Sequence, residues 1–284
     1  MMERLAVGSA QIAYADSMGE GDPLLLLHGG LLSDWFVPVA ADPRLAGCRV
    51  VRMERAGYVR PEDATVPFTI AERAAHGAEL LAARGITRAY VGGHSSGAII
   101  ALQMALDFPD LVAGLVLIEP APGGELASAT AIDVAQGPMR ASMERFAAGD
   151  AEAGYDLFMR ATCVADHADV LEGALGPGAL ARAIEQSRAF PAEAAAFADW
   201  TFGAAEGERL TTPVLAIAGT ATEHDCPLPP DSVPRLQALV PQTEIAWLPG
   251  GNHMMTLTDP SGVSELIGSF VARNPIPAPA GREG

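Results

Sequence analysis

Apolar residues in this chain fall into short continuous runs that alternate with longer stretches of helical spacing. Four consecutive leucines at 24–27 are typical of a strand buried on both faces. Similar apolar runs predict further strands at 49–54, 88–92, 114–119, 213–219 and 244–248. Helical spacing predicts helices at 69–84, 98–107, 230–240 and 260–273. Two alternating segments, 4–8 and 10–15, indicate an antiparallel hairpin at the start. This alternation of strands and helices predicts an α/β fold, with a parallel sheet covered by helices on both faces.

The alternation pauses between residues 121 and 210. This region is rich in alanine and methionine, has no clear strand, and shows helix-like stretches near 138–148, 150–162 and 178–200. Ligands of an open parallel sheet bind beyond the carboxyl ends of its strands, and an insertion at that end would cover the site. We therefore predict three parts: an α/β core of residues 1–120 and 211–273, a helical lid at 121–210, and a disordered tail at 274–284.

Composition narrows the range of partners. The chain has 284 residues, 49% of them hydrophobic, and a net charge of −17, which argues against nucleic acid, anionic membranes and polyanionic substrates. Its three cysteines are far apart and odd in number, so they indicate neither a disulfide framework nor a zinc site. The first residues do not resemble a secretion signal, and no apolar run approaches the roughly 18 residues that span a membrane. We expect a cytoplasmic protein with a small-molecule substrate, and a homodimer stays open.

The segment Gly93-His94-Ser95-Ser96-Gly97 matches the G-x-S-x-G pattern, which puts a serine on a sharp turn between a strand and a helix. Both glycines are needed, because a Cβ two positions before or after the serine would clash with nearby backbone. A strand is expected before the motif and a helix after it, which is the context that supports a nucleophile on Ser95. The alternative is an ordinary glycine-rich turn.

A serine hydroxyl needs a base, and the base needs an orienting acid. We predict His253 as the base, since it follows the last expected strand in a glycine-flanked loop. Two acids compete: Glu119 at the end of the 114–119 strand, and Asp225 six residues past Gly219. Such a loop more often carries its aspartate about three residues on, where Thr222 stands. Glu223 is a third, weaker candidate.

The tetrahedral intermediate of acyl transfer also needs two N–H donors for its oxyanion. One is expected from the backbone of Ser96, the residue after the nucleophile. The other is expected from the loop after the leucine strand, at Gly30 or Leu31. The two nearby histidines, His28 and His94, are interpreted as structural.

With these motifs, the chain resembles the α/β-hydrolase fold superfamily in its lidded form over roughly residues 4–273. The resemblance is carried by Leu-Leu-Leu-Leu-His-Gly-Gly (24–30), Gly-Gly-His-Ser-Ser-Gly (92–97), Gly-Leu-Val-Leu-Ile-Glu-Pro (114–120) and Leu-Pro-Gly-Gly-Asn-His (248–253). It implies an eight-stranded, mostly parallel sheet, a serine–acid–histidine triad and no cofactor. Members place the acid after either of two neighbouring strands, so Glu119 and Asp225 both stay open. The turn Glu54-Arg55-Ala56-Gly57 looks like a structural variant of the family's aspartate–arginine–glycine turn.

The predicted function is that of a serine hydrolase acting on a small or medium apolar ester, thioester or lactone. Epoxide hydrolases and haloalkane dehalogenases, which share the fold, resemble one another in using aspartate where Ser95 stands. Large apolar residues of the lid region could line an acyl pocket or form plain lid core: Met139, Met143, Phe146, Phe158, Met159, Phe190, Phe197, Trp200 and Phe202. The alternative is a cyclase, lyase or ligand-binding protein that uses the lidded pocket without an acyl-serine step.

Overall fold

The fold is built on one central sheet, seen in a computed structural model that describes residues 2–60 and 68–277. Its strands are β1 (Glu3–Val7), β2 (Ala10–Asp16), β3 (Asp22–Leu27), β4 (Cys48–Glu54), β5 (Ala89–His94), β6 (Val112–Ile118), β7 (Val214–Gly219) and β8 (Thr243–Leu248). They lie in the order β1-β2-β4-β3-β5-β6-β7-β8. The strands β4, β3, β5, β6, β7 and β8 are parallel to one another. At the other side of the sheet, β1 pairs antiparallel with β2, and β2 pairs antiparallel with β4. The eight-stranded, mostly parallel sheet predicted from the sequence is confirmed.

The leucine run on β3 shows why the sequence forms this sheet. Leu25 and Leu27 pack into the apolar cluster on one face, whereas Leu24 and Leu26 pack into the cluster on the other. All four are fully buried. Successive side chains of a strand point to opposite faces, so a continuous apolar run suits a strand with helices on both sides. Burial of each leucine contributes about 1.5–3 kcal/mol.

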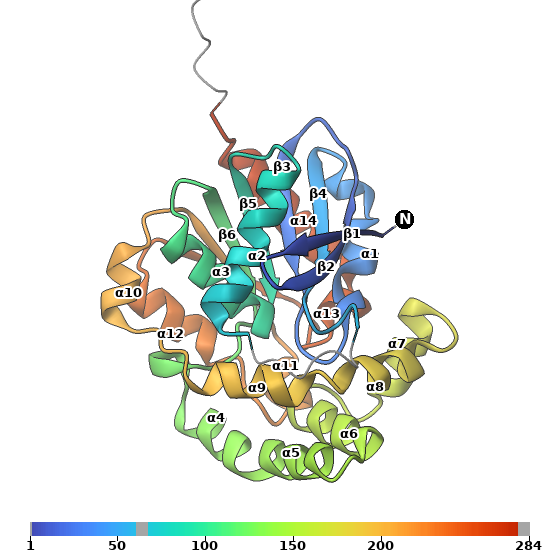
Figure 1. Ribbon diagram of the computed structural model, residues 1–284. Helices are drawn as coiled ribbons and strands as arrows, with labels where there is room; N and C mark the ends of the chain where they lie inside the picture. The colour runs from blue at the N-terminus through green and yellow to red at the C-terminus, as the bar shows by residue number, and fades with distance from the viewer. Residues whose placement is uncertain (1, 61–67, 278–284) are drawn as a thin grey trace, which may run out of the picture.

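Helices cover both faces of the sheet (Figure 1). One face carries α2 (Ile70–Ala83), α3 (Ser96–Asp107) and α12 (Ser232–Leu239), and the other carries α1 (Val37–Ala40) and α14 (Pro260–Arg273). Helix α2 begins with a capping box, in which the Thr69 side chain accepts the Glu72 N–H while the Glu72 carboxylate accepts the Thr69 N–H. Two short helices, α11 (Thr222–Asp225) and α13 (Met255–Thr258), follow β7 and β8. The tail begins after α14, and the Ile276 N–H donates to Asp22 Oδ2 at 3.1 Å; residues 278–284 lie outside the described residues.

Between β6 and β7 the described chain forms no strand; after a 3-10 turn at Gly124–Leu126 it forms a series of helices. These are α4 (Ala129–Val134), a π-helical turn (Ala135–Met139), α5 (Arg140–Ala147), α6 (Ala151–Thr162), α7 (His167–Leu175), α8 (Ala179–Ser187), α9 (Phe190–Ala198) and α10 (Ala204–Arg209). We call α4 to α9 the inserted helices. Figure 1 shows them as a layer across one end of the sheet.

This region contains more helices than its sequence predicts. The helix-like stretch 178–200 divides into α8 and α9, because Pro191 fits only in the first turn of a helix. The short helices α4 and α7 were not predicted, since each has fewer than ten residues and too few turns for a clear apolar period. Pro138 lies inside the π-helical turn, where a wider turn accommodates a residue that lacks an N–H.

In the turn between β5 and α3, backbone passes very close to backbone. A Cβ on Gly93 would lie 2.3 Å from the Gly97 carbonyl oxygen, and a Cβ on Gly97 would lie 2.1 Å from the Leu27 carbonyl oxygen. Both contacts are with backbone, which cannot rotate away. The chain therefore requires glycine on each side of the turn that carries Ser95.

Substitution of Gly97 by alanine is expected to destabilise the protein by about 1–3 kcal/mol or more, because β3 would have to move away from α3. The matched control is Gly173→Ala on α7, an exposed helical position where no atom lies within 4 Å of an added Cβ. That control should be neutral or stabilising by about 0.5–1 kcal/mol. Urea denaturation measures both, and equal midpoints for Gly97→Ala and the unmodified protein would contradict the argument.

Candidate active site

Ser95 occupies a strained backbone conformation between β5 and α3. Its φ of 54° and ψ of −120° fall outside the regions that L-residues prefer, at a cost of about 1–3 kcal/mol. Two hydrogen bonds fix the turn: the Ser95 N–H donates to the Ile118 carbonyl at 2.9 Å, and the Ala121 N–H donates to the Ser95 carbonyl at 3.2 Å. The turn is thereby held at the end of β6, and Ser95 lines a cavity there.

The carboxyl group of Glu119 lies directly after β6 and is almost fully buried. Its Oε1 accepts two hydrogen bonds, from the Gly219 N–H at 2.9 Å and from the Thr222 hydroxyl at 2.5 Å. Its Oε2 lies 2.7 Å from Nδ1 of His253. Glu119 also has a positive φ of 39°, which is uncommon for a non-glycine residue. Three donors from two neighbouring loops therefore fix one orientation of this carboxyl group.

The imidazole of His253 is buried beside Glu119, in the loop between β8 and α13. Because Nδ1 faces a carboxylate oxygen, Nδ1 carries the proton and Nε2 keeps its lone pair in the neutral ring. The His253 carbonyl oxygen lies 2.9 Å from Nε2 of His94, and the two ring centroids are 4.7 Å apart. The glycine-flanked loop identified in the sequence thus brings His253 onto the same sheet end as Ser95 and Glu119.

His94 holds the backbone of His253 in place. It is fully buried, and burial, reinforced by the neighbouring His253, lowers its pKa well below the ordinary value. A neutral His94 whose Nε2–H donates to the His253 carbonyl holds that backbone in place. The indole of Trp35 lies against the same ring, with centroids 4.9 Å apart.

The competing acids lie elsewhere. Asp225 and Glu223 are exposed on α11, and within the described residues no hydrogen bond joins either carboxylate to His253. Thr222 stands at the position where the family's aspartate was sought, and its hydroxyl binds the Glu119 carboxylate instead. That supporting role was missed, although a threonine in place of the aspartate was the available signal.

The loop from His28 to Leu31 approaches the start of α3. Gly30, Ser95 and Ser96 line the same cavity. Ser96 is the first residue of α3, where a backbone N–H has no acceptor within the helix. The N–H of Leu31 donates to the Tyr58 oxygen at 3.0 Å. The Leu31 N–H is therefore already engaged, which leaves Gly30 as the predicted partner of Ser96.

The cavity above Ser95 has a volume of about 360 Å³. None of the described residues that line it is charged, and its polar side chains are those of Ser95, Ser96, Gln136, Thr162 and Trp200. Of the nine large apolar residues singled out in the lid region, five line it: Met139, Phe158, Phe190, Phe197 and Trp200. The other four pack into apolar clusters away from it: Met143, Phe146, Met159 and Phe202.

A buried polar cluster next to Ser96 is not predicted by the sequence. Arg55 and Glu193 form an ion pair at 2.7 Å, and each is at most 1% exposed. Tyr58 donates to the same carboxylate at 2.6 Å. From the sequence, Arg55 is predicted to belong to a structural turn. The available signal was Glu193 itself, a single acidic residue in the apolar segment Phe190-Pro-Ala-Glu-Ala-Ala-Ala-Phe197.

Two further properties bear on the chemistry. Among residues 2–60 and 68–277, no group of three or more His, Cys, Asp or Glu side chains could hold a metal ion. In that same part of the chain, each helix is too short or too polar to cross a membrane.

Several curated proteins have sequences similar to this chain. RutD of Variovorax paradoxus, provisionally named a carbamate hydrolase, is 27% identical over 268 residues, covering 91% of this chain and 94% of that protein. RutD of Enterobacter cloacae is 38% identical over 104 residues, which is 35% of this chain and 38% of that protein. Alignments with the first curated relatives span less than half of their length.

Among solved structures, a thermophilic esterase from Thermogutta terrifontis superposes with a TM-score of 0.71 at 19% identity. The superposition covers 96% of this chain and 98% of the esterase, and at this identity it shows a shared fold. The model of the Alpha/beta hydrolase family matches residues 24–266, a range that contains Ser95, Glu119 and His253. The chain therefore belongs to the alpha/beta hydrolase family.

Proposed function

We propose that this protein is a serine hydrolase that cleaves a small to medium apolar ester, thioester or lactone through an acyl-enzyme on Ser95. The observation that carries the proposal is the 2.7 Å contact between His253 Nδ1 and Glu119 Oε2, at the sheet end where Ser95 has its strained turn. Relatives named as carbamate hydrolases and a structural neighbour named as an esterase support a reaction at an acyl carbon.

In the proposed mechanism, Nε2 of His253 accepts the proton of the Ser95 hydroxyl while the oxygen attacks the acyl carbon. The carbonyl π electrons move onto oxygen, and the N–H groups of Gly30 and Ser96 stabilise that oxyanion. Collapse expels the alcohol or thiol, which takes its proton from His253. In the second half of the reaction, His253 takes a proton from water, which attacks the acyl carbon. The acid is released and Ser95 regains its proton from His253. Glu119 orients the ring and stabilises its cationic form.

The cavity favours a neutral acyl group. Its lining is apolar and uncharged, so a charged acyl group would lose its hydration without gaining an ionic partner. A volume of about 360 Å³ lies at the lower end of the range for small-molecule sites. The proposed substrate is accordingly an uncharged acyl group of limited length.

Replacement of Ser95 by alanine is expected to lower ester turnover by at least about 10³-fold, because the nucleophile is lost. A fluorophosphonate should label Ser95, as located by peptide mass spectrometry. Ser269→Ala on α14, remote from the cavity, is the matched control and should retain activity. Full turnover by Ser95→Ala would overturn the mechanism, and a well-folded protein that no fluorophosphonate labels would favour a non-hydrolytic role.

Replacement of Glu119 by glutamine distinguishes the two acids. Oε1 already accepts two hydrogen bonds, so the amide oxygen should stay there and turn its NH₂ toward His253. That donor would force the wrong imidazole tautomer, and kcat should fall by about 10³–10⁴-fold. Asp225→Asn, on exposed α11, should stay within about twofold. If the Asp225 variant were the impaired one in steady-state assays, the assignment of Glu119 would be wrong.

A neutral acyl group should be preferred over a charged one of similar size. The kcat/KM of a butyryl ester should exceed that of a monosuccinyl ester of the same alcohol by at least about 10²-fold, because the cavity offers no partner for the second carboxylate. Comparable values for the two esters would contradict the proposed substrate class.

A further inference from the structure

One of the contacts between the inserted helices and the core is a buried ion pair. Glu193 of α9 is 0% exposed, and its Oε1 lies 2.7 Å from Nη1 of Arg55, which follows β4. Neither charge has access to water, so each depends on the other and on further hydrogen bonds. Burial alone would raise the pKa of the Glu193 carboxyl, but Arg55, Arg73 and the hydrogen bond from Tyr58 outweigh it and hold that pKa below its ordinary value.

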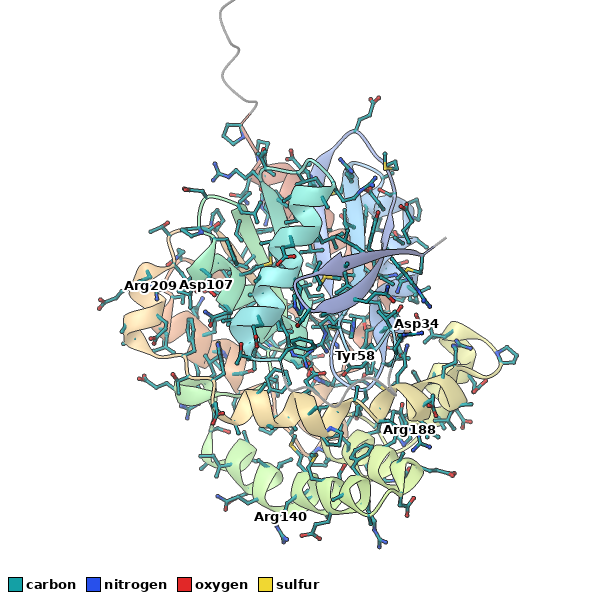
Figure 2. The ribbon with its side chains drawn as sticks, viewed as in Figure 1. Asp34, Tyr58, Asp107, Arg140, Arg188 and Arg209 are labelled. Carbon is teal, nitrogen blue, oxygen red and sulfur yellow. The ribbon has the colours of Figure 1, made fainter. Side chains whose placement is uncertain are left out.

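Glu193 binds two other groups of the core. The Tyr58 hydroxyl donates to Oε2 at 2.6 Å, and the Ser96 hydroxyl donates to Oε1 at 3.1 Å. Figure 2 shows Tyr58 at the boundary between the strands and the inserted helices. A single carboxylate from α9 therefore engages three side chains of the core.

Each of these three side chains belongs to, or is hydrogen-bonded to, a backbone segment beside Ser95. Ser96 itself supplies one oxyanion donor. The Tyr58 oxygen accepts the N–H of Leu31 at 3.0 Å, and Nη2 of Arg55 donates to the Gly29 carbonyl at 2.8 Å. Gly30, which supplies the second donor, lies between these two anchored residues.

The hydrogen bond from Arg55 to the Gly29 carbonyl also fixes the direction of the Gly30 N–H. The peptide unit is planar and trans, so the Gly29 carbonyl and the Gly30 N–H point in opposite directions. His28 holds the same carbonyl: its Nε2 accepts the Arg55 N–H at 3.0 Å, which leaves the proton on Nδ1, 2.7 Å from the Gly29 oxygen. With its carbonyl held by Arg55 and His28, this peptide cannot flip without breaking both bonds.

We infer that Glu193 is a positioning residue, through which α9 completes the oxyanion hole by fixing the backbones of Gly30 and Ser96. The inference rests on the proposed function, because it assigns those N–H groups to an oxyanion. Lifting α9 away from the core would leave Arg55 unpaired and so weaken one of the two contacts that hold the Gly29 carbonyl. Catalytic competence is thus coupled to the seating of an inserted helix that also walls the acyl cavity.

A pair of tyrosines tests the inference without disturbing packing. Tyr58→Phe removes the hydroxyl that joins Glu193 to Leu31, and kcat should fall by about 10-fold with KM within about twofold, since the loss affects mainly the transition state. Tyr155→Phe is the matched control: Tyr155 is equally buried, and its hydroxyl has no hydrogen-bond partner within the described chain. That variant should retain kcat and KM.

Inhibition by a trifluoromethyl ketone gives a second readout, because its adduct on Ser95 carries an oxyanion. The inhibition constant should rise about 10-fold in Tyr58→Phe and stay unchanged in Tyr155→Phe. Equal kcat and equal inhibition constants for the two variants would overturn the inference. If Ser95→Ala were active, the proposed function itself would fail; an inactive Ser95→Ala with indistinguishable tyrosine variants would refute only the role of Glu193.

Paired removal of the charges separates positioning from stability. Glu193→Met leaves Arg55 buried and unpaired, and its denaturation midpoint should drop well below that of the unmodified protein. The double variant Arg55→Met/Glu193→Met removes both charges and should recover most of that midpoint, while kcat stays at least about 10-fold low. Recovery of kcat together with stability would show that the pair serves folding alone and would overturn the inference.

Discussion

A carboxyl group buried away from water needs hydrogen-bond donors in place of the water it has lost, and the site depends on how this chain supplies them to Glu119. Its donors come from Gly219 at the end of β7, from Thr222 just after it, and from His253 after β8. These donors converge because β6, β7 and β8 are adjacent and parallel, so their carboxyl ends meet at one edge. The register of the sheet therefore sets the position of the imidazole as firmly as the local loop does.

A second buried carboxylate lies at the same end of the sheet, but it comes from a helix of the insertion and not from a strand end. Glu193 comes from the inserted helices, and its partners are an arginine, a tyrosine and a serine of the core. Another polar contact lies nearby, where Gln186 of α8 donates to Ser33 at 2.9 Å and to Glu54 at 3.1 Å. Directional polar contacts thus seat α8 and α9, while apolar side chains of the same layer form the cavity.

The local sequence is enough to predict those features whose geometry is decided within a few residues. The leucines of β3 predict a strand buried on both faces, and the glycines at 93 and 97 predict a turn in which backbone passes close to backbone. It was insufficient where partners are distant in the chain. Glu119 and Asp225 both stayed open because the choice depends on which carboxylate the loop after β8 reaches. That loop lies more than a hundred residues beyond β6. Thr222 looked like a missing acid, yet its hydroxyl is a donor to the acid from the neighbouring strand.

The sequence by itself determined the α/β architecture, the strained turn at Ser95 and the loop that carries His253, because these follow from apolar periodicity and from the steric demands of glycine. The tertiary structure alone decided which carboxylate faces His253, which apolar residues line the cavity, and that Glu193 reaches Arg55. Such contacts depend on the relative placement of elements that are distant in the sequence. A hydrogen bond forms only when donor and acceptor are brought within about 3 Å, and no local pattern specifies that distance.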